Sequence, residues 1–320
     1  MNENSIPLSD PHITAADVSA EGCGSHTSKD RNMTMNAAGA IREALAEGLV
    51  IPYFGPGVLK LAGEACPLPA APEVLVDRLT AKASVPHKIR KQLTAAAQFI
   101  ENFKHRKTVA AAMREAFGAA VPPTPLHRLF ASVPAVRLIV HAWYDDLPQR
   151  ALAGKKGWGM AQGVSQAEHF GEWVHYFYGE NGERAEPADA EKWSTLLYQP
   201  LGSVSPAANF LVSDSDFVEV LTEIDIQTPI PEAVQNIRKG RHFLFMGCRF
   251  STQLERIFAR QVIKRSSDRH WAILNEEPTR NETRFLSQYN IQRIPLPLSA
   301  LTALLQSDAA PMQATTGTAA

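Results

Sequence analysis

Short apolar runs alternate with stretches of helical periodicity along most of the chain. The runs are four to six residues long and, except for the last, mostly apolar, which favours strands that are buried on both faces. They occupy residues 50–54, 136–140, 210–213, 242–247, 270–274 and 291–294. Between them apolar residues recur at helical spacing, as in Ile41, Leu45 and Leu49. This alternation predicts an α/β fold, a Rossmann-like doubly wound parallel sheet with a helical insertion.

We expect one such domain over residues 36–305, with two departures from the regular alternation. An amphipathic pattern places a helical insert at about residues 78–132, with a long helix beginning near Ile89. At about residues 153–200, glycines and polar residues are interleaved with aromatic ones, including Phe170. This composition predicts an irregular surface insert with a small aromatic cluster of its own.

The two ends of the chain are predicted to be disordered tails, at residues 1–35 and 306–320. Their composition is polar with isolated apolar residues, so that burial cannot repay the entropy of ordering them. Met33 and Met35 lie just before the first periodic segment and are alternatives to Met1 as the start of the protein.

Composition removes several classes of function. The 320 residues include 32 basic and 33 acidic side chains, so no net field recruits nucleic acid or an anionic membrane. Cys23, Cys66 and Cys248 are too few and too scattered for a disulfide framework or a zinc ribbon. No stretch is long and apolar enough to span a membrane. We therefore expect a reduced, cytoplasmic protein of bacterial type.

Two strand ends carry candidate nucleotide chemistry. The first run leads into Gly55-Pro56-Gly57, where glycines would let the backbone approach a phosphate, although Pro56 lacks an N–H donor. A side chain at Gly57 would then stand between the backbone and the phosphates. The run at residues 270–274 ends on Asn275, followed by Glu-Glu-Pro-Thr. Each feature alone is equally consistent with an ordinary turn.

The order of these features along the chain resembles that of the sirtuin-like family, which includes protein deacylases and bacterial NAD-hydrolysing domains. The resemblance runs from about residue 39 to residue 305. It implies that Gly55 and Gly57 line a pyrophosphate, that Gly247 approaches the adenosine half, and that Asn275 bonds its ribose. The implied ligand is NAD, ADP-ribose or a related adenine nucleotide.

Two residues on the loop after the 242–247 run could also belong to this site. Arg249 could contact a phosphate with charge-assisted hydrogen bonds, and Ser251 lies on the same loop. The alternative for Arg249 is a solvated loop cation, and for Asn275 a plain turn residue.

Departures from the family's pattern affect its catalytic positions. Trp143 stands where the family has an asparagine, and Leu201 stands where it has a histidine base before Gly-Ser. An indole offers one donor and a leucine offers none, so the usual chemistry has no groups to carry it. His141 is a candidate for a relocated base, because strand alternation would put it on the same face as Trp143. Its alternative is a hydrogen-bonded histidine at a strand end.

No metal is expected, because His127, His169, His175 and His270 do not show ligand spacing. The sequence therefore predicts a sirtuin-like protein that binds a nucleotide without the family's usual catalysis, as a sensor or as a partner subunit. Alternatives are an active NAD hydrolase using relocated residues and a structural scaffold with a filled pocket. A protein partner or a second copy of the chain is left open.

Overall fold

The computed structural model of the chain describes residues 28–223 and 230–306. Of the predicted tails, residues 1–27 and 307–320 lie outside these limits. Residues 28–35 do not form a tail, because they already belong to helix α1 (Ser28–Ala46). This helix is anchored further along by Ala37, Ala38 and Ile41, which are buried, and it extends outward from that anchor.

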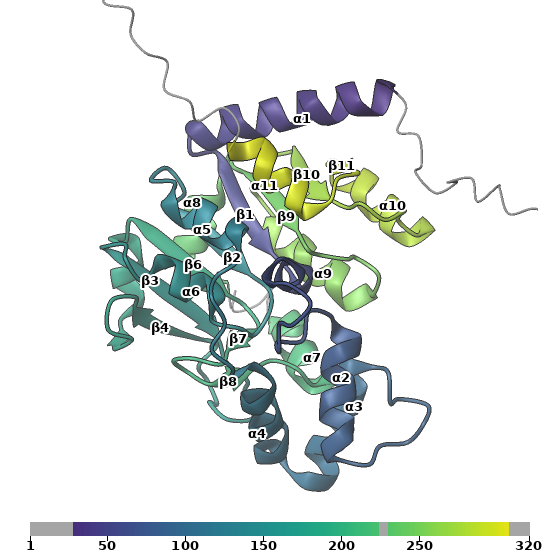
Figure 1. Cartoon of the computed structure of the whole chain (residues 1–320). Coiled ribbons are helices and arrows are strands. Elements are labelled where there is room, and N and C mark those ends of the chain that lie inside the picture. Colours follow the sequence, from purple (N-terminus) through teal and green to yellow (C-terminus); the bar gives the residue numbers. More distant parts are fainter. Residues whose placement is uncertain (1–27, 224–229, 307–320) are drawn as a thin grey trace, which may run out of the picture.

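Nine strands of the described chain form one sheet, and six of its eight neighbouring pairs are parallel (Figure 1). The order across the sheet is β11-β10-β9-β1-β2-β6-β3-β4-β5, and only the β3–β4 and β4–β5 pairs are antiparallel. The strands are β1 (Val50–Phe54), β2 (Leu138–His141), β3 (Trp158–Gly163), β4 (Val174–Tyr178), β5 (Arg184–Ala185), β6 (Thr195–Gln199), β9 (His242–Met246), β10 (His270–Ile273) and β11 (Ile291–Ile294). The predicted α/β, Rossmann-like class is confirmed.

Helices cover both faces of the sheet, as alternate strand residues require. Val50 and Phe54 pack into the core beneath α1, α5 (Pro125–Ser132) and α11 (Leu298–Gln306), with α6 (Leu147–Leu152) beside them. Ile51 and Tyr53 face the opposite core. That second core is covered by α7 (Asp214–Glu223), α8 (Glu232–Arg238), α9 (Gln253–Ile263) and α10 (Arg280–Gln288).

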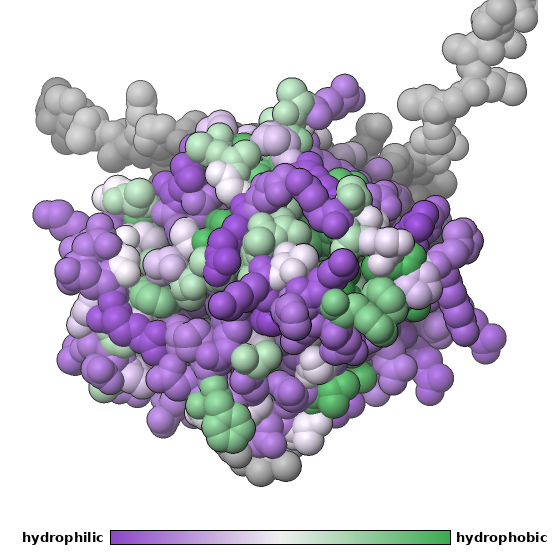
Figure 2. Space-filling view, turned by 90° about the horizontal axis from the view of Figure 1, so that it is seen from below, coloured by the Kyte–Doolittle hydropathy of each residue, from purple (hydrophilic) through white to green (hydrophobic). Residues whose placement is uncertain are grey.

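The helical insert forms a lobe at one end of the molecule (Figure 1). It consists of α2 (Pro72–Lys82), α3 (Leu93–Lys104) and α4 (Arg106–Phe117), reached from β1 through the short helix η1 (Pro56–Ala62). The insert therefore begins slightly earlier than residue 78, and its long helix begins at Leu93 rather than near Ile89. Seen from this end, the surface is mostly hydrophilic, with separate hydrophobic side chains (Figure 2).

The irregular insert predicted at about residues 153–200 is wrong, because this segment supplies β3, β4, β5 and β6 to the main sheet. Its glycines mark close packing: a Cβ at Gly159 would lie 2.3 Å from Trp193, and one at Gly179 would lie 2.2 Å from Trp158. The expected separate aromatic cluster is also wrong. Trp158 belongs to the main core, whereas Phe170 is 95% exposed.

The run predicted at residues 210–213 is a strand over its first residue alone. Asn209–Phe210 is β8, which pairs with β7 (Gly202–Ser203) in a separate two-stranded sheet. Among the described residues, no helix is long and apolar enough to cross a membrane.

Strand order reverses at β1. The chain first builds outward from β1 to β2, and later returns to place β9 on the other side of β1. In open α/β sheets, ligands bind outside the carboxyl ends of the strands at such a reversal. The residues that follow β1 and β9 are therefore the first place to look for a site.

Candidate functional site

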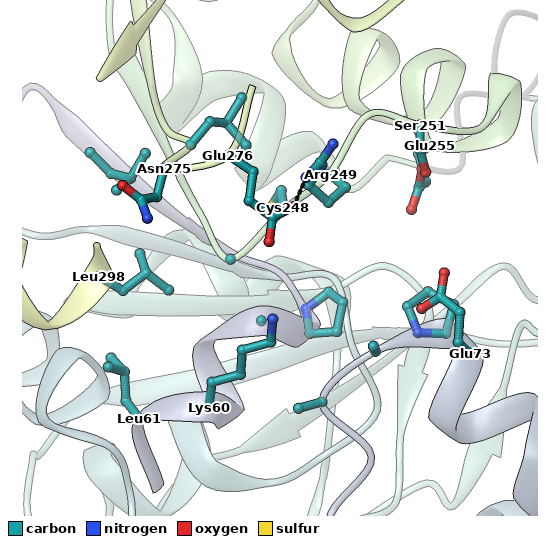
Figure 3. Close-up of a pocket in the computed structure, with 18 of the residues that line it drawn as sticks. Lys60, Leu61, Glu73, Cys248, Arg249, Ser251, Glu255, Asn275, Glu276 and Leu298 are labelled. Carbon is teal, nitrogen blue, oxygen red and sulfur yellow. Dashed lines mark hydrogen bonds and ion pairs between the residues drawn. The ribbon is translucent and has the colours of Figure 1, made fainter. Parts of the chain in front are cut away.

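A cavity of about 580 Å³ lies at this reversal, beyond the carboxyl ends of β1, β9 and β10 (Figure 3). Its size is that of a small-ligand site. Five of the residues singled out in the sequence line it, namely Gly57, Gly247, Arg249, Ser251 and Asn275. The sixth, Gly55, lines a neighbouring cavity instead.

The glycines of the two loops pack against each other. A Cβ on Gly247 would lie 2.4 Å from the backbone nitrogen of Val58, and Gly247 also has a φ of +66°. A Cβ on Gly57 would lie 2.9 Å from the carbonyl oxygen of Gly247, and one on Gly55 would lie 2.7 Å from the same oxygen. The three glycines thus let β1 and β9 end in close contact. A side chain at Gly57 would contact Gly247. The sequence had suggested that it would instead stand between the backbone and a phosphate.

The backbone N–H groups of the turn after β1 already donate hydrogen bonds, most of them across this contact. The Gly55 N–H donates to the Met246 carbonyl at 2.9 Å, and the Gly57 N–H donates to the Gly247 carbonyl at 2.9 Å. The Val58 N–H donates back to Gly55 at 3.2 Å, and Pro56 has no N–H. The turn after β1 therefore shapes the cavity but has no N–H left for a phosphate.

Arg249 is neither a solvated cation nor a free phosphate ligand. Its Nε donates to Oε1 of Glu282 at 2.9 Å and its second guanidinium nitrogen to Oε2 at 3.1 Å, which is a bidentate ion pair. Its remaining nitrogen bonds the exposed Glu276 (Figure 3). Because Glu282 also accepts from the Thr279 N–H at the start of α10, Arg249 joins the β9 loop to that helix.

The Glu282 carboxylate is strongly held in its charged form. Burial alone would raise its pKa, but hydrogen bonds from Arg249 and Thr279 outweigh this and lower the pKa to about 2. The same bonds raise the pKa of Arg249, which stays a cation throughout the accessible pH range. The ion pair is therefore a permanent part of the cavity wall near neutral pH.

Ser251 and Asn275 differ in their freedom to bind a ligand. The Ser251 hydroxyl donates to Glu255, which also accepts from the Thr252 N–H and caps α9. The amide of Asn275 is exposed at the rim and makes no hydrogen bond with the described residues. Asn275 is thus available to a ligand, whereas Ser251 is occupied in holding the loop.

Lys60 is a lining residue that sequence reasoning missed. It lies on η1, and its side chain extends toward the middle of the cavity (Figure 3). Its ammonium group makes no ion pair within the described chain. The other charged lining residues are Arg249 and the carboxylates Glu73, Glu255 and Glu276. A lysine three residues beyond the last glycine of the turn was the available signal, since the short helix points it back at the turn.

A second cavity of about 450 Å³ adjoins the first and shares Cys248, Arg249 and Glu255 with it. Its walls are mainly large apolar side chains, including Trp143, Leu201 and Phe217. The Trp143 indole N–H donates to the Pro69 carbonyl at 2.8 Å, and its ring meets Phe117 edge-on with centroids 5.8 Å apart. Trp143 is therefore fixed in the wall by both a hydrogen bond and packing.

Residues 137–294 match the family model described as the SIR2-like domain. The chain carries a SIR2-like domain. No curated protein matches the chain. The matched range begins just before β2 and ends at the last residue of β11.

The structure places β1 inside the sheet of the SIR2-like domain, although the strand lies before the matched range. All five residues of β1 pair with β9, from Val50 opposite His242 to Phe54 opposite Met246. The glycine turn that follows β1 then meets Gly247. The folded unit is thus larger than the matched segment.

His141 does not reach either cavity of the SIR2-like domain. Its Nε2 lies 3.1 Å from Oδ2 of Asp145, and its ring lies among Phe54 and His127 on the face covered by α5. Trp143 packs in the opposite core, because β2 ends at His141 and strand alternation stops there. The expected placement of both side chains on one face is wrong. His141 is a buried, hydrogen-bonded histidine at a strand end.

Proposed function

We propose that the first cavity of this SIR2-like domain binds NAD, ADP-ribose or a related adenine nucleotide. The observation that carries the proposal is the position of the cavity, where strand order reverses and where the glycine loops after β1 and β9 meet. Lys60 supports it, since its ammonium group lines the cavity, makes no ion pair with the described residues and offers a charge to a phosphate. Asn275 supports it too, because its exposed side-chain amide makes no hydrogen bond with the described residues and can bond a ribose hydroxyl.

The phosphates would compete with Glu276 for Arg249. Glu276 bonds only one guanidinium nitrogen and is 73% exposed, so it can turn outward while Glu282 keeps hold of the arginine. Arg249 would then contribute one charge-assisted hydrogen bond to the ligand. The loop from Cys248 to Ser251 contributes a second kind of donor. Its N–H groups at Cys248, Arg249 and Ser251 make no hydrogen bond with the described residues.

We expect the protein to bind the nucleotide without performing the family's usual catalysis. Trp143 and Leu201 line the second cavity, where they provide neither the amide nor the base that the resemblance assigns to those positions. His141 cannot replace them from the opposite face of the sheet. The function is therefore that of a nucleotide-responsive sensor or of a subunit whose partner performs the reaction.

Calorimetric titration of the purified protein with NAD, ADP-ribose and ATP tests the binding. We expect at least one of them to bind, and a ligand at 100 times its Kd should stabilise the fold by about 2.7 kcal/mol. Lys60→Gln should weaken binding about tenfold, and Glu276→Gln should strengthen it severalfold by releasing Arg249. Glu277→Gln is the matched control, because Glu277 pairs with Arg293 outside the cavity. No binding of any of the three at about 1 mM would contradict the proposal and favour a scaffold.

Nicotinamide release separates the sensor from a hydrolase. We expect none from the native protein. Its nicotinamide release is compared with that of the double variant Trp143→Asn with Leu201→His, which has the family's residue types at both positions. A melting curve first verifies that the double variant is folded. Turnover by the native protein would overturn the non-catalytic part of the proposal and leave the binding part intact.

A further inference from the structure

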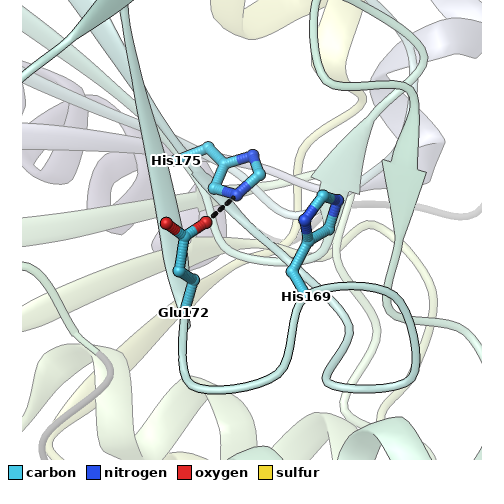
Figure 4. Close-up of side chains that lie close together, drawn as sticks. All are labelled: His169, Glu172 and His175. Carbon is cyan, nitrogen blue, oxygen red and sulfur yellow. Dashed lines mark hydrogen bonds and ion pairs between the residues drawn. The ribbon is translucent and has the colours of Figure 1, made fainter.

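Three potential metal ligands meet where the loop after β3 leads into β4, and none of them lines either cavity. They are His169, Glu172 and His175, and one ligand atom from each lies within 4.8 Å of the other two (Figure 4). Two residues separate each ligand from the next. His169 and Glu172 lie on the irregular loop and His175 is in β4, so no single helical or strand periodicity indicates the cluster. The spacing of the histidines in the sequence did not indicate this cluster, which includes Glu172.

The cluster is partly organised without an ion. Nε2 of His175 lies 2.7 Å from Oε2 of Glu172, and the His169 and His175 rings meet edge-on with centroids 4.5 Å apart. The loop is closed by its own backbone, since the His169 N–H donates to Ser165 and the Glu172 N–H donates to His169, both at 3.1 Å. These bonds shape the turn that carries His169 and Glu172, and β4 carries His175 beside it.

We propose that His169, Glu172 and His175 bind a divalent transition-metal ion, Zn²⁺ in the first instance. Two imidazole nitrogens and one carboxylate oxygen are a ligand set that zinc accepts, with water completing the four-coordinate shell. Bond lengths of about 2.0–2.1 Å require ligand atoms roughly 3.4 Å apart, so the present separations need only side-chain adjustment. Glu172 is exposed and His169 half-buried, so both can make that adjustment.

Arg184 is the group that opposes the ion. Its guanidinium lies 3.3 Å from Oε2 of Glu172 and also rests over the Phe177 ring. The side chain is 47% exposed, so it can turn away into solvent when an ion takes its place. Removing the charge of Arg184 should therefore strengthen metal binding. If Glu172 were only an ion-pair partner of Arg184 and not a metal ligand, the same change would leave metal affinity unaltered.

A bound ion would fix the loop that carries Phe170. This residue lies between the two ligands His169 and Glu172, and its ring is 95% exposed. Coordination on both sides of it would restrict the backbone that presents the ring. Cleavage after an exposed phenylalanine by chymotrypsin therefore reports on the loop separately from metal affinity.

The test uses the full chain, stripped of metal with a chelator, desalted and titrated with ZnCl₂. We expect one Zn²⁺ per chain, weakened by at least about tenfold in His169→Gln and in Glu172→Gln. His87→Gln, on an exposed histidine elsewhere, should bind like the parent, and Arg184→Gln should bind more tightly. Zn²⁺ should also slow chymotryptic cleavage in the parent but not in His169→Gln.

Two results would overturn the site. One is less than half an equivalent of Zn²⁺ bound at about 10 µM metal. The other is undiminished affinity in both His169→Gln and Glu172→Gln, which would place the ion elsewhere, for example on the cysteines. Because these two side chains are not buried, their substitution leaves the fold intact, and a melting curve for each variant verifies this.

Discussion

The two adjoining cavities differ in the groups that shape their walls. The first is shaped by backbone, where the glycine turn after β1 meets Gly247, and its other walls carry charge. The second is shaped by large side chains such as Trp143 and Phe217. A change of side chain can thus remodel the second cavity, whereas the backbone contact in the wall of the first can change only if the strands move. Substitutions at Trp143 and Leu201 would therefore alter the second cavity and leave the glycine contact of the first in place.

Gly247→Val should have the largest effect, because it breaks the backbone contact that shapes the first cavity. The new side chain would meet Val58 and Gly57 in a left-handed conformation, and we expect a loss of about 5 kcal/mol in the free energy of unfolding. Gly240→Val is the control: its φ of +71° is similar, but no atom lies within 4 Å of its Cβ position. It should lose about 2 kcal/mol. Equal losses of unfolding free energy in urea denaturation of the two variants would show that the positive φ alone, and not the contact between the two glycine loops, accounts for the effect.

Trp143→Ala should affect the second cavity and spare the first. Loss of the indole packing and of the bond to Pro69 should reduce the free energy of unfolding by about 3 kcal/mol. Trp143→Phe keeps most of the packing and should lose about 1 kcal/mol. In both variants nucleotide affinity should stay within about threefold of the parent. A larger change in affinity would mean that the two cavities act as one.

Glu282→Gln tests the ion pair in the wall that both cavities share through Arg249. At pH 7 the variant should lose about 2 kcal/mol of unfolding free energy, since Arg249 is only partly buried and solvent screens its charge. The folded pKa of Glu282 is about 2, below its ordinary value of 4.5, so its contribution is present above pH 4.5 and is lost as pH falls toward 2. The difference between parent and variant should therefore shrink across this window in urea unfolding.

Glu277→Gln serves as the control for the same measurement. It removes a similar arginine–carboxylate pair whose glutamate is 86% exposed, and it should change stability by less than about 0.5 kcal/mol. A loss as large as that of Glu282→Gln would show that exposure does not separate the two pairs.

Asn275→Ala should have the smallest effect, confined to ligand affinity. Because the amide is exposed and unpaired within the described chain, the unfolding free energy should stay within about 0.5 kcal/mol of the parent. Nucleotide affinity should fall about fivefold from the loss of one hydrogen bond. Unchanged affinity in calorimetry would remove Asn275 from the proposed site.

The central strands could be predicted from the sequence because they are buried on both faces and are therefore almost continuously apolar. The strands at residues 158–199 could not, since their glycines serve close packing against Trp158 and Trp193, which only the fold brings near. The same contrast applies to the site. Gly57, Gly247 and Asn275 could be predicted to lie together, because each follows a recognisable strand and ligands bind where the order of such strands reverses.

Partners that are distant in sequence or lie on irregular loops gave no such signal. Glu282 is far along the chain from Arg249, and nothing in the local pattern of either residue indicates their pairing. His169 and Glu172 on the loop after β3 come together with His175 of β4. Lys60 lies on a short helix whose direction follows from packing rather than from periodicity. In each case the contact is set by tertiary structure.

The position of β1 at the middle of the sheet constrains the order in which the protein can assemble. β1 is made early, but its partner β9 begins at His242, after roughly three quarters of the chain has been synthesised. Until then one edge of an apolar strand has no native neighbour. Pairings between residues so distant in sequence slow folding and expose strand edges to aggregation. Refolding yield should therefore fall steeply as protein concentration rises, and an expressed fragment limited to residues 137–294 would lack the central strand altogether.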